Sequence, residues 1–227
     1  MARRIREWNI FALLAGAVAF GQPSPAHAID SPEASVNYDR ALQCLTLAIA
    51  YEAGFEPLEG KQAVGEVIIN RAHNPAYPKS VCGVVFQGSA RRTGCQFTFT
   101  CDGSLNRSLN PTVLYKAREV ARGILAGKIA PQVDGATHYH ANYVSPYWAP
   151  SLIRVGRIGA HIFYRSPGSP DRAQSYSVTS EPLIASLGPW LGAGDSLTQK
   201  NAASSTPTPA NPVQPSQQFT LWGLAIR

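Results

Sequence analysis

The sequence predicts one domain of the α+β class, mainly helical with a small β region, over residues 38–165. Apolar residues recur at the three-to-four spacing of a helix in three segments, at about 38–53, 58–72 and 110–127. Two shorter segments, Gln96–Cys101 and Ile158–Arg165, instead have the character of strands. A domain of this length can bury a core of its own.

Residues 1–28 are typical of a secretory signal peptide. They begin with a basic segment, continue with the apolar run from Trp8 to Phe20, which is too short for a membrane span, and end with the small-x-small site Ala26-His27-Ala28. Their removal would take away three arginines and one glutamate and lower the formal net charge from +6 to +4. We therefore expect a periplasmic or extracellular protein with no transmembrane segment after cleavage.

The segments on either side of the domain are poor in residues that could form a core. Residues 29–37 are expected to be a linker. Residues 166–227 are rich in Pro, Ser, Thr and Gln and are expected to be largely disordered, most clearly from Ser204 to Gln218. The apolar patch that starts at Phe219 could dock on the domain or on an unknown envelope partner. The mild positive charge suits an anionic envelope polymer; no nucleic-acid partner and no cofactor are expected.

The first predicted helix carries a carboxylate on its apolar face. Leu45, Ile49 and Glu52 follow one another at helical spacing and share one side. Gly54 and Pro57 place Glu52 near the helix C-terminus, where both burial and the helix dipole disfavour negative charge. Both effects raise a carboxyl pKa, as a general acid near neutral pH requires. The alternative is a glutamate at a frayed helix end that reaches water or pairs with an arginine.

The second predicted helix runs from Leu58 to about Ala72. Arg71 ends its apolar face and is expected to cap the last carbonyl groups rather than to contact a substrate. Asn70, at the edge of that face, is expected to brace a loop through side-chain to backbone hydrogen bonds.

The third predicted helix begins at Asn110-Pro111, since asparagine can cap a helix and proline suits the first helical position. Between the second and third helices lie a short apolar segment, Val81–Gln87, a basic polar loop from Gly88 to Gly94, and the predicted strand 96–101. The third helix has a clear amphipathic pattern and is expected to be scaffold.

The four cysteines form an even set in an exported chain, which favours disulfides over metal or thiol chemistry. They are Cys44, Cys82, Cys95 and Cys101, and they allow three pairings, among which the sequence does not choose. The last three flank one polar loop, so at least one bridge is expected to pin it. A zinc site is the weaker interpretation of these cysteines, because the sequence contains no CxxC spacing.

The block after Ala136 is dense in polar and aromatic residues. His138 and His140 share a side if this segment is extended, and with His161 and a carboxylate they could form a zinc centre. We prefer the interpretation in which these histidines hydrogen-bond in a polar cleft or on the surface, with no metal.

The chain resembles a known family, the SleB-type cell-wall hydrolases. The residues that carry the resemblance follow the family's order over nearly the whole domain: Cys44, Tyr51-Glu-Ala, Glu56, Glu59-Gly60, Ala63-Val64, Asn70-Arg71, Tyr77-Pro, Val81-Cys-Gly-Val-Val, Cys95-Gln-Phe, Cys101-Asp-Gly, Thr137-His-Tyr-His, Trp148 and Ile158-Gly-Ala-His-Ile-Phe-Tyr-Arg. The family's usual motif reads Glu-Ala-Arg-Gly-Glu, whereas this chain has Glu52-Ala-Gly-Phe-Glu56. The spacing of the two glutamates is kept and the middle pair differs.

The resemblance implies a lysozyme-like fold and cleavage of peptidoglycan between N-acetylmuramic acid and N-acetylglucosamine. It places the catalytic acid at Glu52. It favours a lytic transglycosylase, in which one glutamate acts as acid and then as base, over a hydrolytic muramidase, for which Glu56, Glu59 and Asp102 are candidate second carboxylates. The residues expected to bind the glycan are Glu56, Phe97, His138, Tyr139, His140, Trp148 and His161.

Two other functions remain open at this stage. The first is a zinc-dependent amidase or peptidase that cuts the peptides of the same polymer with the three histidines. The second is a glycan-binding module without catalysis.

Overall fold

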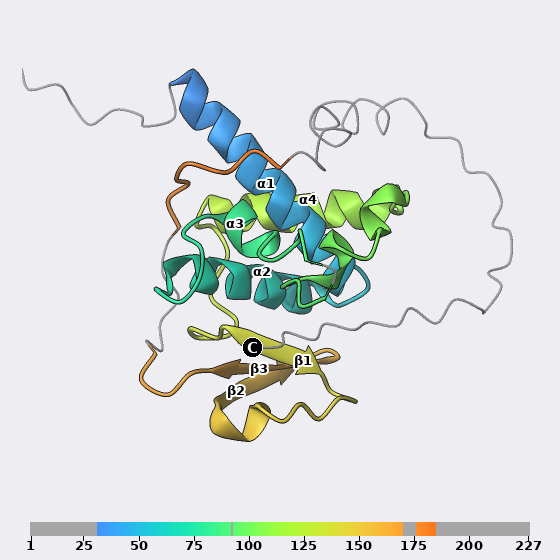
Figure 1. Cartoon of the computed structure of the whole chain (residues 1–227), viewed down its shortest axis with the longest axis vertical. Coiled ribbons are helices and arrows are strands. Elements are labelled where there is room, and N and C mark those ends of the chain that lie inside the picture. The colour runs from blue at the N-terminus through green and yellow to red at the C-terminus, as the bar shows by residue number, and fades with distance from the viewer. Residues whose placement is uncertain (1–30, 92, 170–175, 185–227) are drawn as a thin grey trace, which may run out of the picture.

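A layer of helices lies above a small antiparallel sheet (Figure 1). Before residue 166, the chain passes from the helices to the sheet only once. The computed structural model describes residues 31–91, 93–169 and 176–184. Within these residues it contains four α-helices, three short 3₁₀ helices and three strands. The prediction of a mainly helical α+β domain is therefore confirmed. The predicted signal peptide lies outside the described residues.

Helix α1, Pro32–Ala53, passes through the centre of the helical layer. It begins where the Ser31 hydroxyl accepts a hydrogen bond from the Ala34 N–H at 3.1 Å, with proline in the first turn. Residues 32–37, predicted as linker, are thus the first turns of this helix. From Ala41 onward most of its side chains are buried, because α2, α3 and α4 all pack on it.

The other predicted helices are confirmed with nearly the expected bounds. Helix α2 is Leu58–His73 and helix α4 is Pro111–Leu125, with the Asn110 side chain accepting a hydrogen bond from Thr112 N at 2.8 Å. The short apolar segment after Ser80 is a further helix, α3, Val81–Val85.

The segment 96–101 is not a strand, contrary to the prediction. Its centre, Thr98–Thr100, is a 3₁₀ helix, and a disulfide between Cys95 and Cys101 holds their Cα atoms 6.5 Å apart. Six extended residues would separate them by about 20 Å. The alternating aromatic pattern arises instead because Phe97 and Phe99 both turn into the core, where they are 2% and 3% exposed.

The sheet has the order β1-β3-β2, with both pairs antiparallel. Its strands are β1, His138–Ala141; β2, Ile153–Ile158; and β3, His161–Arg165. The predicted strand 158–165 is divided by a turn at Gly159, whose φ of +56° suits glycine. The sequence did not predict β2, because this edge strand is largely exposed and carries no apolar alternation.

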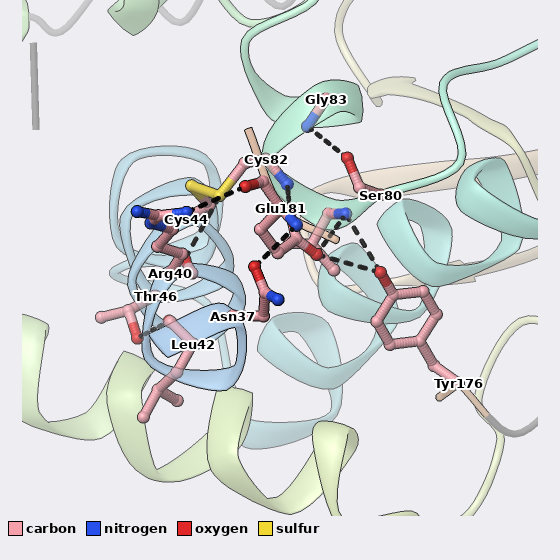
Figure 2. The surroundings of a disulfide bond; sticks show 11 residues. Asn37, Arg40, Leu42, Cys44, Thr46, Ser80, Cys82, Gly83, Tyr176 and Glu181 are labelled. Atoms are coloured by element: carbon pink, nitrogen blue, oxygen red, sulfur yellow. Dashed lines mark hydrogen bonds between the residues drawn. A yellow bond between two sulfur atoms is a disulfide. The ribbon is translucent and has the colours of Figure 1, made fainter. Parts of the chain in front are cut away.

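Part of the C-terminal segment lies against the helical layer, although the sequence predicted a largely disordered tail. Residues 176–184 run beside α1 and α3, and Glu181 is 2% exposed (Figures 1 and 2). Its carboxylate accepts hydrogen bonds from the backbone N–H groups of Val81 at 3.1 Å and Cys82 at 2.8 Å, and its carbonyl oxygen accepts one from Arg40 at 3.2 Å. The predicted disordered segment from Ser204 and the apolar patch at Phe219 lie outside the described residues.

The two disulfides resolve the pairing that the sequence left open. Cys44 pairs with Cys82 across 38 residues and fastens α1 to α3, beside Glu181 (Figure 2). Cys95 pairs with Cys101, so one bridge does pin the polar loop, as expected. Among the described helices, none is long and apolar enough to cross a membrane.

Candidate active site

Glu52 lies at the C-terminal end of α1, where the helical layer meets the sheet. Its side chain is partly exposed. The hydroxyl of Tyr139 in β1 donates a hydrogen bond to Glu52 Oε2 at 3.1 Å, and the Tyr139 ring is itself 7% exposed. The sequence therefore brings together a carboxylate from the first helix and a phenol from the first strand, 87 residues apart.

The environment of Glu52 raises its pKa to about 7, from an ordinary value near 4.5. Burial is the largest cause, and the negative charge of Asp102 adds to it. The hydrogen bond from Tyr139 and the positive charge of Arg71 act in the opposite direction, because both stabilise the carboxylate. Glu52 is thus poised to hold a proton and release it near neutral pH, which is the property required of a general acid.

Arg71 is a buried cation that packs beside this site. It is 2% exposed, and its guanidinium lies 5.5 Å from the ring centres of both Tyr77 and Phe97. Its Nε donates to the carbonyl oxygen of Thr137 at 2.7 Å, so it joins α2 to the residue before β1 instead of capping its own helix as predicted. Asn70 acts as predicted, since its amide donates to the carbonyl oxygen of Ala136 at 3.0 Å.

Phe97 does not line a surface groove. Its ring is 2% exposed and packs between Arg71 and Phe99, so the prediction that it binds glycan is wrong. Alternating aromatics indicate one shared face, but the core occupies that face here.

Glu56, another predicted binding residue, supports the sheet. Its Oε2 accepts a hydrogen bond from Ala160 N at 3.1 Å, in the turn between β2 and β3. A Cβ atom at Gly159 would lie 1.7 Å from the same oxygen, so only glycine allows the carboxylate to approach this closely. The negative charge of Glu56 also reaches His161 and favours the protonated ring, although burial is the larger effect and lowers the His161 pKa.

The other two candidate carboxylates differ in their relation to Glu52. Asp102 is close enough to raise the pKa of Glu52, and its Oδ1 accepts a hydrogen bond from Ser104 N at 2.8 Å. Glu59 is exposed in the first turn of α2. Asp102 is therefore the stronger of these two candidates for a second carboxylate.

The three histidines are divided between the two faces of the sheet. His138 and His140 share the outer face with Trp148, whose ring centre is 5.5 and 5.6 Å from theirs. His161 lies on the inner face against Tyr139, with ring centres 5.2 Å apart. In the part of the chain that the structure describes, no three His, Cys, Asp or Glu side chains gather as a metal site would require. The arrangement on which the zinc alternative depends is absent there.

The outer face of the sheet carries a continuous aromatic cluster. His140 Nε2 is 2.9 Å from the Tyr164 hydroxyl, and their rings stack with centres 5.2 Å apart. Trp148 packs edge-on against Tyr164, at 5.7 Å between ring centres, and is itself partly exposed. Burial, followed by the charge of Arg71, lowers the pKa of His138 to about 4, so this histidine is neutral at physiological pH.

Sequence reasoning missed the support provided by Tyr51. Its hydroxyl donates to the carbonyl oxygen of Ser104 at 2.8 Å, and its ring stacks on Phe99 with centres 4.5 Å apart. This holds the loop that carries Asp102 against the end of α1. The signal in the sequence was its place beside Glu52 in the Tyr51-Glu-Ala motif, because its partners Phe99 and Ser104 are distant along the chain.

Comparisons with known proteins find a matching family and similar proteins. Residues 55–164 match the family described as Cell Wall Hydrolase, in a segment that begins just after Glu52. The chain is similar to the spore cortex-lytic enzyme of Bacillus subtilis, with 32% identity over 122 residues that cover 54% of this chain and 36% of that protein. It is also similar to the spore cortex-lytic enzyme of Halalkalibacterium halodurans, with 33% identity over 126 residues that cover 55% and 34%.

Among solved structures, the catalytic domain of the Bacillus cereus SleB protein is 26% identical, with a TM-score of 0.43, over 56% of this chain and 90% of that one. The chain spans about a third of the length of the curated relatives it matches.

Proposed function

We propose, from the match of residues 55–164 to the Cell Wall Hydrolase family, that this protein cleaves the glycan strands of peptidoglycan with Glu52 as its catalytic acid. The observation that carries the proposal is the pKa of about 7 at Glu52, at the junction of helices and sheet, with its carboxylate held by Tyr139. A carboxyl group that is still substantially protonated at neutral pH can donate to a glycosidic oxygen.

The proposed reaction cuts the β-1,4 bond between N-acetylmuramic acid and N-acetylglucosamine. Protonated Glu52 gives its proton to the leaving oxygen, the bond breaks, and positive charge develops at the ring carbon and ring oxygen of muramic acid. The resulting Glu52 carboxylate is then stabilised by the Tyr139 hydroxyl and by the positive charge of Arg71. In this mechanism Tyr139 is a positioning residue.

The second step distinguishes two types of enzyme. In a lytic transglycosylase, the Glu52 carboxylate takes the proton of the muramoyl 6-hydroxyl, whose oxygen closes the 1,6-anhydro ring without a second carboxylate. In a muramidase, water is added and a second carboxylate such as Asp102 takes part. We propose the first type, because Glu56 is engaged with the β2–β3 turn and Asp102 with Ser104.

We propose that the aromatic cluster on the outer sheet face contributes to glycan binding away from the bond that is cut, because Tyr139, which holds Glu52, lies on the opposite face of the sheet. Trp148 offers a partly exposed ring, fixed by His138 and His140, on which a sugar can stack. Because the substrate is an envelope polymer, we infer that the protein works outside the cytoplasm.

The test is release of soluble fragments from purified peptidoglycan by the native protein and by Glu52→Gln. Glu59→Gln is the matched control, since it makes the same change at an exposed carboxylate on the next helix. We expect Glu52→Gln to reduce the rate at least about 100-fold and Glu59→Gln to leave it unchanged. Equal rates for Glu52→Gln and the native protein would refute the proposal.

A further inference from the structure

A cavity lies beside the turn that follows Glu52. It has a volume of about 630 Å³ and is enclosed by the first turns of α2, the middle of α4 and Ile129. Its walls are mainly apolar, formed by Leu58, Tyr115 and Val120 among others. Glu56 and Pro57 form one side, so the cavity is one short turn of chain away from the candidate acid.

Two lysines and two glutamates line this mainly apolar cavity. Lys61 lines it although the residue is only 6% exposed, and its ammonium group donates to the carbonyl oxygen of Glu56. Lys116 lines the cavity from α4 and is exposed. The two cations are close enough to repel, since Lys116 adds to the effect of burial in lowering the Lys61 pKa.

The two carboxylates of the cavity wall are engaged elsewhere. Glu119 forms an ion pair with Arg122, one turn along α4. The Glu56 carboxylate accepts the hydrogen bond from Ala160 N, on the side of the sheet. Within the described ranges of the chain, neither lysine forms an ion pair, although the negative charge of Glu56 acts on Lys61 and opposes the lowering of its pKa. Lys116 is therefore the cation more available to an anion that enters the cavity.

We propose that this cavity binds the peptide stem of peptidoglycan, with Lys116 and Lys61 receiving a stem carboxylate and the apolar walls receiving its short aliphatic side chains. The proposal rests on the proposed function for its choice of polymer. Stem peptides combine free carboxylates with alanine methyl groups, which matches a mainly apolar cavity whose wall carries Lys116 and Lys61 beside two glutamates that are engaged with Ala160 and Arg122. A site of this kind would make the protein prefer glycan that carries peptides over glycan stripped of them.

The test is calorimetric titration of the full chain with free stem tetrapeptide, L-alanyl-γ-D-glutamyl-diaminopimelyl-D-alanine, at low salt. We expect saturable binding that Lys116→Gln weakens about fivefold, because one partly solvated charge contact is lost. Lys79→Gln is the control: it makes the same charge change at an exposed lysine outside the cavity, and is expected to leave binding unchanged. Tetrapeptide with amidated carboxyl groups is expected to bind more weakly than the free acid.

The outcomes separate this proposal from the function itself. No saturable binding, or equal binding by Lys116→Gln and the native protein, would overturn the peptide site even if glycan cleavage is observed. Binding that depends on Lys116 and persists in Glu52→Gln would support it, whether or not the native protein cleaves glycan.

Discussion

At the scale of the residue, the proton affinity of Glu52 follows from its place on α1. The helix places it on the face that the core and sheet cover, and burial outweighs the stabilisation that Tyr139 and Arg71 give to the carboxylate. Because the folded state binds this proton more tightly than the unfolded state does, the ionised form costs stability. Catalytic competence and stability therefore oppose each other at this residue.

Glu52→Gln is expected to stabilise the protein at alkaline pH. The native folded pKa of about 7 exceeds the ordinary value of 4.5, so the free energy of unfolding falls as pH rises through that interval. Glutamine at this position does not titrate, so the variant does not undergo this loss. Between pH 4 and pH 8, its free energy of unfolding should therefore rise by roughly 2–3 kcal/mol relative to that of the native protein. Denaturant unfolding at the two pH values measures the difference, and an equal effect of the substitution at both would contradict the raised pKa.

Tyr139→Phe is expected to move the pH profile of cleavage upward. The hydroxyl stabilises the Glu52 carboxylate, so its loss raises the pKa of Glu52. The pH at which the rate falls by half should rise by about one unit, while the ring keeps its packing against Phe163. A profile that only decreases in height, without moving along the pH axis, would mean that the hydroxyl does not act through Glu52.

The sequence could indicate the unusual environment of Glu52, because helical periodicity places this carboxylate on the apolar face of α1. It could not separate Phe97 from Trp148, since an aromatic residue in the core and one in a groove leave the same pattern. The separation of His161 from His138 and His140 was equally hidden, because it depends on the register between β1 and β3, where Ala141 pairs with His161.

At the scale of the element, the contact between the α1–α2 turn and the β2–β3 turn holds the sheet under the helices. It consists of Glu56 and the backbone of Gly159 and Ala160. Because this contact joins the turn after Glu52 to the sheet that carries Tyr139, it helps to set the geometry of the site.

Gly159→Ala is expected to weaken this contact. The added methyl would meet Glu56 Oε2 at 1.7 Å, and the φ of +56° is unfavourable for alanine. We expect a loss of about 2 kcal/mol or more in unfolding free energy, together with lower activity. Gly156→Ala in β2 is the control, because its added carbon would meet nothing within 4 Å. Equal stability of the two variants would show that the contact with Glu56 is dispensable.

Residues 176–184 form a second long-range contact, on the far side of the helical layer from the sheet (Figure 1). The Glu181 carboxylate caps the first N–H groups of α3 and accepts a hydrogen bond from the Tyr176 hydroxyl at 3.0 Å. The disulfide between Cys44 and Cys82 lies beside it (Figure 2). The segment thus reinforces the junction of α1 and α3.

Glu181→Ala is expected to destabilise the protein by about 2–4 kcal/mol, because it leaves buried N–H groups without acceptors. Asp39→Ala on the exposed side of α1 should change stability by less than about 0.5 kcal/mol. Thermal unfolding of both variants with the disulfides intact makes the comparison. A Glu181→Ala variant as stable as Asp39→Ala would mean that the tail segment contributes nothing to the fold.

The long helices could be predicted because each carries its own periodicity, to which α4 adds the Asn110 cap. The segment 96–101 and strand β2 could not. In the first, a disulfide overrides the extended form that alternation suggests. In the second, an edge strand has no fully buried residue, and a β-bulge between Arg154 and Gly156 interrupts its alternation.

At the scale of the whole molecule, the site exists only where the two layers meet. Glu52 comes from the first helix, Tyr139 from the first strand, and Arg71 joins them through Thr137. Contacts over such sequence separations leave no local signal, so the sequence indicated the acid but not its neighbours. The resemblance to SleB-type cell-wall hydrolases suggested the proposed reaction, and the geometry around Glu52 gives the physical reasons for proposing it as the acid.

The most direct test of this account is mass spectrometry of the muropeptides released from purified peptidoglycan by the native protein and by Glu52→Gln. We predict fragments that end in 1,6-anhydro-muramic acid with the native protein and none with the variant. Reducing muramic ends would replace the transglycosylase by a muramidase and direct attention to Asp102. Release of stem peptides with intact glycan, or the same fragments from both proteins, would contradict the assignment of Glu52 as the acid that cuts the glycan.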